Sequence, residues 1–482
     1  MAIDRRIIGL VSMGQGWRLA FAALIVVLAF TAAFGRLSAA VDAKTSIAFV
    51  GVTVIPMDRE ETLPDQTVLI QAGKIVAVGP TKQTALPHDA IVIDGKGRFL
   101  MPGLADMHVH LEHKDFFLLF LRNGVTSIRN MWGTPFHQSL QTLVERGDIP
   151  GPTIYTTGPI IDGSPRIWPQ SKAVRTAEEA RIEVRRQKAD GYEALKVYEN
   201  LSWDAYDALT TTAKETGMRI EGHVPMAVGV EHALVTGQHS IEHLSGYIWA
   251  VKRDDFEVTG TGRRWRLKAA YDVDPQKIKL IALASKESGV WNCVTLIVTQ
   301  RFADTVGGFA PTRLSRPEMR FVPPWIRARW DPKKDFRMQH MGRGAVRDMR
   351  KASEVNTMIT SALRDAGAGI LLGTDAPNPL IVPGFAIHDE LENLVRAGLS
   401  PYEALRTGTV NAASALERAG EFGVVKSGSR ADLLLLEANP LNDLSTLQNP
   451  VGVMARGHWF NAAELDARLE ALATKYAAHE GN

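Results

Sequence analysis

Two histidines separated by one residue, His108 and His110, form the strongest candidate for metal chemistry in this sequence. They follow the mostly apolar segment 101–107, which is typical of a strand. Alternate residues of a strand point to the same face, so both imidazoles can reach one ion. Neutral imidazole nitrogens are good ligands for Zn²⁺ and related divalent metals. A His-x-His pair also occurs by chance, so a metal site requires further ligands elsewhere in the chain.

Side chains of ligand type recur after other apolar segments, namely Lys196, His223, His243 and Asp375. Each alone has an ordinary structural interpretation: a core histidine, a helix cap at Asp375, or a lysine that extends to the surface. Lys196 lies between two apolar residues, which directs its ammonium inward, where a bare charge would be costly. Taken together, ligand types at the ends of five predicted strands indicate one metal site.

The elements that must position these residues alternate along the middle of the chain. Strands are predicted at 104–107, 125–130, 153–159, 194–198, 219–224, 240–244, 290–298 and 369–374. Helical patterns occupy 176–190, 203–215 and 275–288. This α/β alternation predicts a (β/α)₈ TIM barrel, whose catalytic face is formed by the carboxyl ends of the strands. A doubly wound open sheet is the alternative, although no Gly-x-Gly-x-x-Gly turn follows the first strand.

The two ends of the chain contain short β segments that resemble each other in composition. They lie at 47–54, 66–77 and 91–99, and again at 423–429, 432–436 and 451–460. Neither group is long enough to close a sandwich alone, so we expect them to pair into one small β-sandwich domain. The predicted divisions are 1–43 for a targeting segment, 44–101 and 419–482 for the β-sandwich and a C-terminal helix, and 102–418 for the barrel.

The N-terminal segment has the order of a secretory signal. Arginines at positions 5, 6 and 18 precede the apolar run 19–35, and small residues follow at positions 38, 39, 40 and 43. An uncleaved membrane anchor is the alternative, because the run is long for a signal peptide. We therefore expect an exported protein that is periplasmic, secreted or anchored to the membrane by this segment.

Composition and charge narrow the classes of partner. The formal net charge of +2 gives no reason to expect nucleic acid. Cys293 is the only cysteine, which excludes an intramolecular disulfide and a cysteine-based zinc finger. We expect a small-molecule or dipeptide substrate. Contact with a membrane is expected only through the N-terminal segment. A homo-oligomer is compatible with the sequence.

Two predicted loops, 247–271 and 300–351, are longer than a barrel requires. Loops that follow barrel strands form the active-site face, so these segments are candidates for a lid or for substrate selection. A surface elaboration or an oligomer contact is the equally weighted alternative.

Several motifs resemble the amidohydrolase superfamily, in the branch of imidazolonepropionase-like proteins and metal-dependent Xaa-Pro dipeptidases. They are the segments 101–110 (MPGLADMHVH), 195–198 (LKVY), 222–223 (GH), 242–243 (EH), 373–375 (GTD) and 428–434 (GSRADLL). The resemblance spans residues 45–460 and implies a β-sandwich, a barrel and two divalent metals, taken as Zn²⁺. It implies that His108, His110 and Asp375 bind one ion, that His223 and His243 bind the other, and that a carboxylated Lys196 bridges them. A single ion beside an unmodified Lys196 is the alternative.

Such a centre predicts hydrolysis of an amide C–N bond by a metal-bridging hydroxide, with Asp375 as the proton shuttle. The expected substrate is a dipeptide or an N-acyl amino acid, and the candidate substrate contacts are Tyr198, Tyr247 and Arg129. Cyclic amides, ureas, carbamates, lactones and phosphotriesters are alternative substrates for the same centre. A binding protein whose barrel has lost its chemistry is the alternative outside the enzymes, and the complete ligand set argues against it.

Overall fold

The computed structural model describes residues 46–257, 263–339 and 341–480. The predicted targeting segment lies outside these residues, so the choice between a signal peptide and an anchor stays a prediction. Within the described ranges, no helix is both long and apolar enough to cross a membrane.

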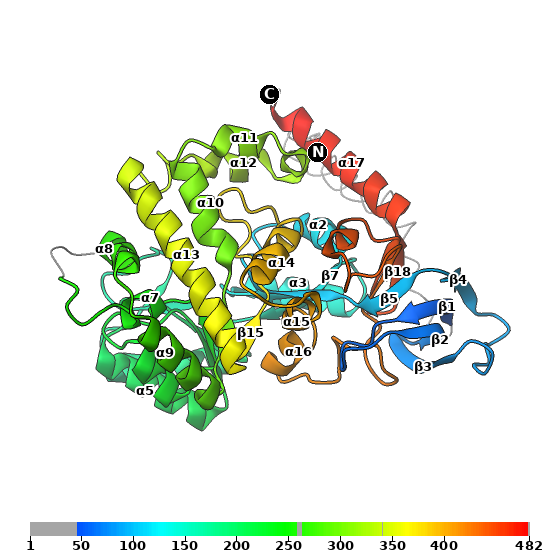
Figure 1. Cartoon of the computed structure of the whole chain (residues 1–482), viewed down its shortest axis with the longest axis horizontal. Helices are drawn as coiled ribbons and strands as arrows, with labels where there is room; N and C mark the ends of the chain where they lie inside the picture. The colour runs from blue at the N-terminus through cyan, green and yellow to red at the C-terminus, as the bar shows by residue number, and fades with distance from the viewer. Residues whose placement is uncertain (1–45, 258–262, 340, 481–482) are drawn as a thin grey trace, which may run out of the picture. The chain divides into compact units, whose positions relative to one another are not determined.

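One mixed sheet joins the two ends of the chain. Its N-terminal strands are β1 (Ile47–Val54), β2 (Leu63–Gln71), β3 (Lys74–Pro80), β4 (Ile91–Asp94) and β5 (Phe99–Pro102), and its C-terminal strands are β16 (Leu433–Leu436), β17 (Gly452–Ala455) and β18 (His458–Asn461). The order is β18-β17-β16-β5-β1-β2-β3, with β4 on β1 (Figure 1). Because β16 pairs directly with β5, the ladder runs as one continuous sheet where a β-sandwich was expected. The domain boundaries themselves stay predictions.

The segment 66–77, predicted as one strand, is a hairpin of β2 and β3. Ala72 and Gly73 form its turn, with φ of +48° and +75°. Two consecutive positive φ angles match the twist of a tight two-residue hairpin turn. The prediction was wrong here because the β-type residues continue through the turn.

Parallel strands are present at all eight positions predicted for the middle of the chain. They are β6 (Leu104–Val109), β7 (Val125–Asn130), β8 (Thr153–Thr156), β11 (Ala194–Val197), β12 (Arg219–Gly222), β13 (Ser240–Glu242), β14 (Trp291–Cys293) and β15 (Gly369–Leu371). Two short strands, β9 (Ile160–Asp162) and β10 (Lys172–Ala173), were not predicted. The α/β prediction is therefore confirmed.

The parallel strands form two ladders, β6-β7-β8 and β10-β9-β11-β12-β13-β14-β15. In the described part of the chain, no continuous ladder closes them into one barrel. Backbone hydrogen bonds outside the ladders cross the two seams between them instead. On the β6–β15 side, the Met107 N–H donates to the Leu372 carbonyl at 2.8 Å and the His110 N–H to the Ala376 carbonyl at 2.7 Å. The Asp375 N–H donates to the His108 carbonyl at 2.7 Å, and the Gly158 N–H donates to the Ala194 carbonyl at 2.8 Å.

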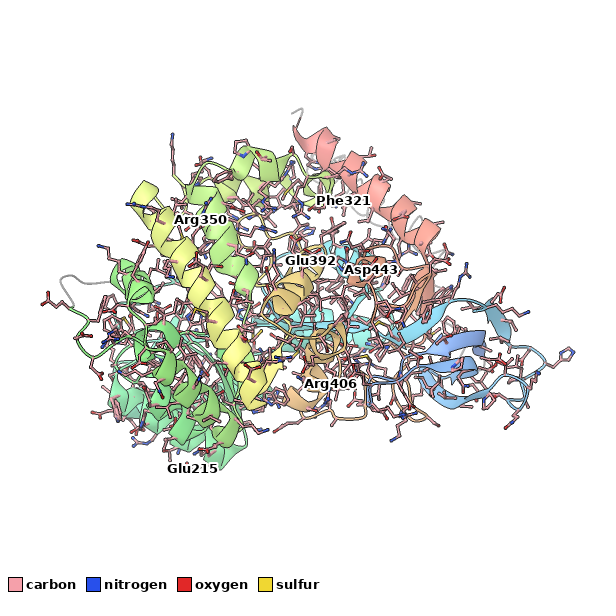
Figure 2. The ribbon with its side chains drawn as sticks, viewed as in Figure 1. Glu215, Phe321, Arg350, Glu392, Arg406 and Asp443 are labelled. Atoms are coloured by element: carbon pink, nitrogen blue, oxygen red, sulfur yellow. The ribbon has the colours of Figure 1, made fainter. Side chains whose placement is uncertain are left out.

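Helices follow most of these strands, and their side chains fill the space around the parallel strands (Figure 2). The three predicted helices are present as α4 (Ala177–Ala189), α5 (Trp203–Thr216) and α9 (Pro275–Ser288). Side-chain caps begin each of them, from Thr176, Ser202 and Asp274. The other helices are α2 (Phe116–Arg122), α3 (Pro135–Glu145), α6 (Val230–Thr236), α7 (Tyr247–Ala250), α8 (Arg263–Lys268), α10 (Leu296–Val306), α11 (Ala310–Leu314), α12 (Pro324–Arg327), α13 (Arg343–Ala366), α14 (Ala386–Arg396), α15 (Pro401–Thr407), α16 (Val410–Ala415) and α17 (Ala462–Glu480).

The predicted strand at 290–298 is wrong beyond Cys293, because α10 begins at Leu296. A carboxylate distant in sequence explains the change. Glu390 of α14 accepts hydrogen bonds from the backbone N–H groups of Leu296 and Ile297, at 2.6 and 2.8 Å. These are two of the N–H groups that a helix start leaves without a partner. The predicted loop 300–351 likewise contains most of α10, all of α11 and α12, and the start of α13.

We expect Glu390→Ala to lower the free energy of unfolding by about 2–3 kcal/mol, because it leaves two buried backbone donors unsatisfied. Glu392→Ala is the matched control, since Glu392 lies on the same helix and is exposed (Figure 2). Urea unfolding of both variants measures the difference. Equal midpoints for the two variants would show that the cap does not stabilise α10.

Candidate metal centre

The predicted ligands gather at the carboxyl ends of the parallel strands. His108 lies in β6 and His110 directly follows it, whereas His223 and His243 directly follow β12 and β13. Lys196 lies in β11, and Asp375 follows β15 by four residues. Because parallel strands end on the same edge, residues up to 267 positions apart in sequence meet in one place.

Asp375 is the centre of this group. Its Oδ1 lies 3.0 Å from His110 Nε2 and 3.4 Å from His108 Nε2, and its Oδ2 lies 3.8 Å from His243 Nε2. His108, His243 and Asp375 each offer a ligand atom within 4.8 Å of the others. The His223 ring lies beside that of His243, with centroids 5.0 Å apart. The structure therefore brings the histidines and Asp375 together, with Lys196 lining the same cavity.

Several polar atoms at this place are buried without a hydrogen-bond partner in the described part of the chain. They are His108 Nε2, His110 Nδ1, Lys196 Nζ and Asp375 Oδ1. Buried polar atoms are normally satisfied, so a group of unsatisfied ones needs an explanation. Nitrogen and carboxylate ligands converging on one point fit a divalent metal, as does the chemistry of the donor set.

The protonation states also suit metal binding. Burial lowers the pKa of His108 well below its ordinary value and that of His243 to about 3. Burial alone would raise the pKa of Asp375, but His243 and His110 hold it at about 2. Burial lowers the pKa of Lys196 to about 8. At neutral pH the two histidines are thus neutral and Asp375 is ionised, which are the forms that bind metals.

Three of the histidines are oriented by a second contact on the other ring nitrogen. His108 Nδ1 hydrogen-bonds to Glu242 Oε2 at 2.6 Å, His223 Nδ1 to Glu199 Oε1 at 3.0 Å, and His243 Nδ1 to Thr295 Oγ1 at 2.6 Å. Such partners fix the tautomer and the ring direction of a metal-binding histidine. They leave Nε2 of each ring as the ligand atom.

Glu242 is a site residue whose role sequence reasoning missed. It is fully buried, and its Oε1 accepts a hydrogen bond from Arg129 Nη2 at 2.9 Å. Arg129 also contacts Glu221 at 3.1 Å and donates to the Met107 carbonyl at 2.7 Å. Glu242 immediately precedes His243, which was the only signal in the sequence. Glu242 also forms a second candidate ligand group with His108 and Cys293. Because the Glu242 carboxylate is already paired with Arg129, a role in orienting His108 fits better than metal binding.

Two further residues shape the backbone at the site. Asp106 accepts hydrogen bonds from the N–H and the hydroxyl of Thr374, at 3.0 and 2.6 Å, which fixes the residue before Asp375. Gly222 has φ of +131°, and a Cβ there would lie 2.3 Å from the Val197 carbonyl oxygen. A side chain at this position would force the Lys196 strand away, so glycine is required.

Two predicted substrate contacts lie outside the site's cavity. Tyr247 is fully buried and donates its hydroxyl to Asn292 Oδ1 at 2.6 Å. Arg129 is engaged by the buried carboxylates described above and does not line the cavity. The structure corrects both expectations, because neither the strand position of Arg129 nor the position of Tyr247 shortly after His243 reveals which way the side chain turns. Tyr198 does line the cavity, and its hydroxyl accepts a hydrogen bond from Trp168 Nε1 at 3.0 Å.

The cavity over the candidate ligands has a volume of about 900 Å³. Both long insertions contribute to its lining, the first through Ile248, Trp249 and Leu267, and the second through residues such as Phe302, Phe336 and Met341. The two insertions therefore form part of the cavity wall, in agreement with a role in substrate selection.

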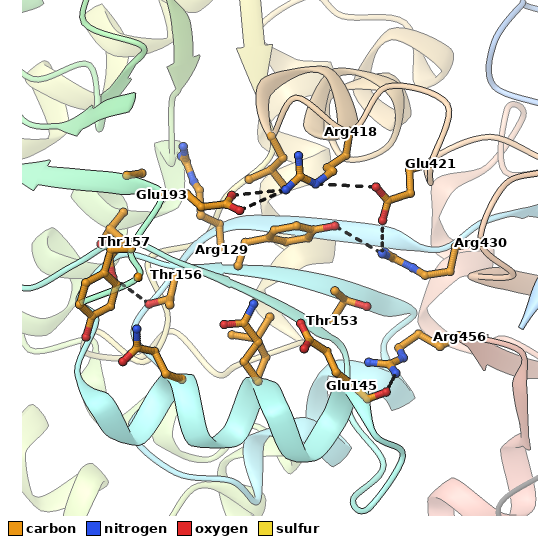
Figure 3. Close-up of a pocket in the computed structure, with 18 of the residues that line it drawn as sticks. Arg129, Glu145, Thr153, Thr156, Thr157, Glu193, Arg418, Glu421, Arg430 and Arg456 are labelled. Carbon is orange, nitrogen blue, oxygen red and sulfur yellow. Dashed lines mark hydrogen bonds and ion pairs between the residues drawn. The ribbon is translucent and has the colours of Figure 1, made fainter. Parts of the chain in front are cut away.

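A second cavity, of about 690 Å³, lies at the opposite ends of the same strands. Its lining is strongly charged, but the charges pair with one another (Figure 3). Arg418 contacts Glu193 and Glu421, and Arg430 contacts Glu421. This cavity contains an ion-pair network that links the parallel strands to the segment 416–430. Among its described lining residues, no group of metal-ligand side chains meets at one point.

Comparisons with known proteins agree with this geometry. The Amidohydrolase family model matches residues 99–460, and the chain belongs to this family. An ochratoxinase of Aspergillus niger is 23% identical over 86% of this chain and 85% of its own length. Among solved structures, bottromycin amidohydrolase has a TM-score of 0.73 at 24% identity, covering 89% of this chain and 92% of that one. A putative prolidase from Bifidobacterium longum has a TM-score of 0.64 at 24% identity, and the match covers 89% of this chain and 99% of the prolidase chain. The predicted membership of the metal-dependent amidohydrolase superfamily is confirmed, and these neighbours imply a TIM barrel with an additional domain.

We expect Glu242→Gln to weaken metal binding by about 10–100-fold, the usual effect of losing a partner that orients a ligand. Glu221→Gln is the matched control, because it removes a carboxylate from Arg129 without touching His108. Metal affinity, measured by competition with a chelator, should be nearly unchanged in the control. Equal losses in both variants would contradict an orienting role for Glu242.

The metal-free protein should lose stability as the pH falls from about 6.5 to about 3. In that window His243 binds a proton in the unfolded chain and not in the folded one, so lower pH favours unfolding. His243→Asn should therefore flatten the pH dependence of the unfolding midpoint, measured with chelator present. His88→Asn, in an exposed position, should leave the dependence unchanged. The same slope in both variants would contradict the low pKa of His243.

Proposed function

We propose that this protein is a metal-dependent hydrolase of amide C–N bonds in small molecules or peptides. The observation behind the proposal is the group of unsatisfied nitrogen and oxygen atoms around Asp375, at the base of a large cavity. We assign His108, His110 and Asp375 to one divalent ion and His223 and His243 to a second, with Zn²⁺ as the best fit to these ligands. The parallel strands then act as a TIM barrel whose two ladders are joined by a few backbone hydrogen bonds.

Lys196 is proposed as the bridging ligand after carboxylation by CO₂. In that step the neutral amine forms an N–C bond with CO₂ and releases one proton, which gives a carbamate. The burial that lowers the pKa of Lys196 to about 8 increases the fraction of reactive neutral amine. The product is anionic, which removes the cost of a buried ammonium without a partner.

In hydrolysis, water adds to the substrate carbonyl carbon, the C–N bond breaks and the amine leaves with a proton. A bound divalent metal supplies Lewis acidity and lowers the pKa of water toward neutrality. Asp375 is ionised at neutral pH, so it can accept the proton of the attacking water and pass it to the leaving nitrogen. Tyr198 is proposed as a substrate contact, because it lines the cavity and its ring centroid lies 4.2 Å from that of His223.

Dipeptides and N-acyl amino acids are the first substrates to test, and the ochratoxinase and prolidase similarities support the choice. Cyclic amides, ureas and carbamates are the second set. The N-terminal pattern of arginines, apolar residues and small residues supports a proposal of export.

We expect Asp375→Asn to lower kcat on any accepted amide by about 10²–10⁴-fold, the usual contribution of a proton-transfer group. Because the amide oxygen can still act as a ligand, much of the metal should remain, as measured by elemental analysis. Asp389→Asn, on α14 and outside the cavity lining, is the control. Full activity in Asp375→Asn would contradict the proposed mechanism.

A further inference from the structure

An aromatic wall extends outward from the candidate ligands along one side of the cavity. The ring of Trp132 lies 6.3 Å from that of His110, Trp168 lies 5.7 Å from Trp132, and Phe336 lies 5.1 Å from Trp168. The planes within this wall are inclined at 57° and 88°, so the rings bury only part of one another's faces. The wall thus begins beside the predicted ligand His110 and ends at Phe336, which is exposed to solvent.

Polar contacts hold Trp168, the middle ring of the wall, in place. The Trp168 indole N–H donates a hydrogen bond to the Tyr198 hydroxyl. The guanidinium of Arg337 lies over the Trp168 ring, 5.2 Å from its centroid. Arg337 is itself fixed by Asp335, through Nε–Oδ1 and Nη2–Oδ2 contacts of 3.0 and 2.6 Å. A wall fixed in this way costs little ordering when a ligand binds.

Phe336 is the residue that a packing role does not explain. Its side chain is 46% exposed, although it is large and apolar. An exposed aromatic ring that continues a wall into a cavity is typical of a binding surface.

Apart from Lys196, which is assigned to the metal centre, the cations that line the cavity do not offer a deep site for a carboxylate. Arg337 is matched by Asp335, Arg266 Nη2 lies 3.2 Å from Glu199, and Arg329 is paired with Glu112. Lys334 is exposed to solvent. An anionic group beside the wall would have to displace one of these pairs, whereas an uncharged ring would not.

We infer that the preferred substrate is an amide with a flat, uncharged aromatic group beside the scissile bond, and that Trp132, Trp168 and Phe336 receive this group. The inference rests on the proposed amide hydrolysis and names its substrate class. A volume of about 900 Å³ suits such a substrate better than a dipeptide of two small residues, since pockets of roughly 300–1,000 Å³ bind drug-sized ligands.

The test compares matched amides on the metal-loaded full chain. On the acyl side, N-acetyl-L-leucinamide is compared with N-(2-naphthoyl)-L-leucinamide. On the amine side, N-acetylglycine methylamide is compared with N-acetylglycine 2-naphthylamide. In at least one pair the naphthyl member should have a kcat/KM about 30-fold higher, as expected for burial of an aromatic ring against aromatic neighbours. Equal or faster hydrolysis of the small members in both pairs would overturn the inference and leave amide hydrolysis intact.

Phe336→Ala should lower kcat/KM for the preferred naphthyl substrate about tenfold and leave the small member unchanged. Phe309→Ala is the matched control, because Phe309 is 48% exposed and does not line the cavity. Trp168→Phe retains an aromatic ring and should keep the preference for naphthyl groups. An unchanged preference in Phe336→Ala would overturn the role of the wall.

Calorimetric binding of 2-naphthamide separates the inference from the proposed function. Binding that weakens in Phe336→Ala and not in Phe309→Ala supports the aromatic site even where no amide is hydrolysed, and in that case the proposed function fails alone. Absence of binding to the wild-type protein, together with no naphthyl preference, would overturn the inference.

Discussion

The buried ion pair between Arg129 and Glu242 connects the main parts of the fold to the candidate metal centre. Arg129 belongs to β7 in one ladder, and Glu242 and Glu221 belong to β13 and β12 in the other. The Nε–H of Arg129 also donates a hydrogen bond to the Met107 carbonyl of β6. Removing one partner of such a pair usually costs about 3–5 kcal/mol, because the other charge remains buried. The same Glu242 orients His108, so fold and site depend on one interaction.

The seam between the ladders has a similar double role. The backbone N–H of Asp375 donates to the carbonyl of His108, while their side chains approach one another in the site. His243 and Asp375 both have positive φ, of +60° and +61°, which is uncommon for residues other than glycine. Such backbone strain persists when surrounding contacts hold it. The Asp106–Thr374 hydrogen bonds and the bond to the His108 carbonyl hold Asp375, and the His243 N–H donates to the Cys293 carbonyl at 2.8 Å.

The long insertions after β13 and β14 line part of the cavity. They form helices and short turns whose side chains complete the walls above the ligands. Three arginines of these insertions that line the cavity are each paired with a carboxylate: Arg337 with Asp335, Arg266 with Glu199 and Arg329 with Glu112. The parallel strands position the candidate ligands, and the insertions add Trp249, Phe302 and Phe336 to the aromatic residues of the cavity.

The sequence by itself determined the positions of the eight parallel strands, three helices and the ligand-type residues at strand ends. These follow from local periodicity and from caps a few residues away, such as Thr176 and Glu179. Tertiary structure alone decided the partners of those residues. Glu242 reaches His108 across 134 positions, and Glu390 begins α10 from 94 positions away. Contacts between residues so far apart in sequence produce no periodic pattern in the sequence. For this reason the sequence around Arg129 does not reveal whether its side chain contacts a substrate or a buried carboxylate.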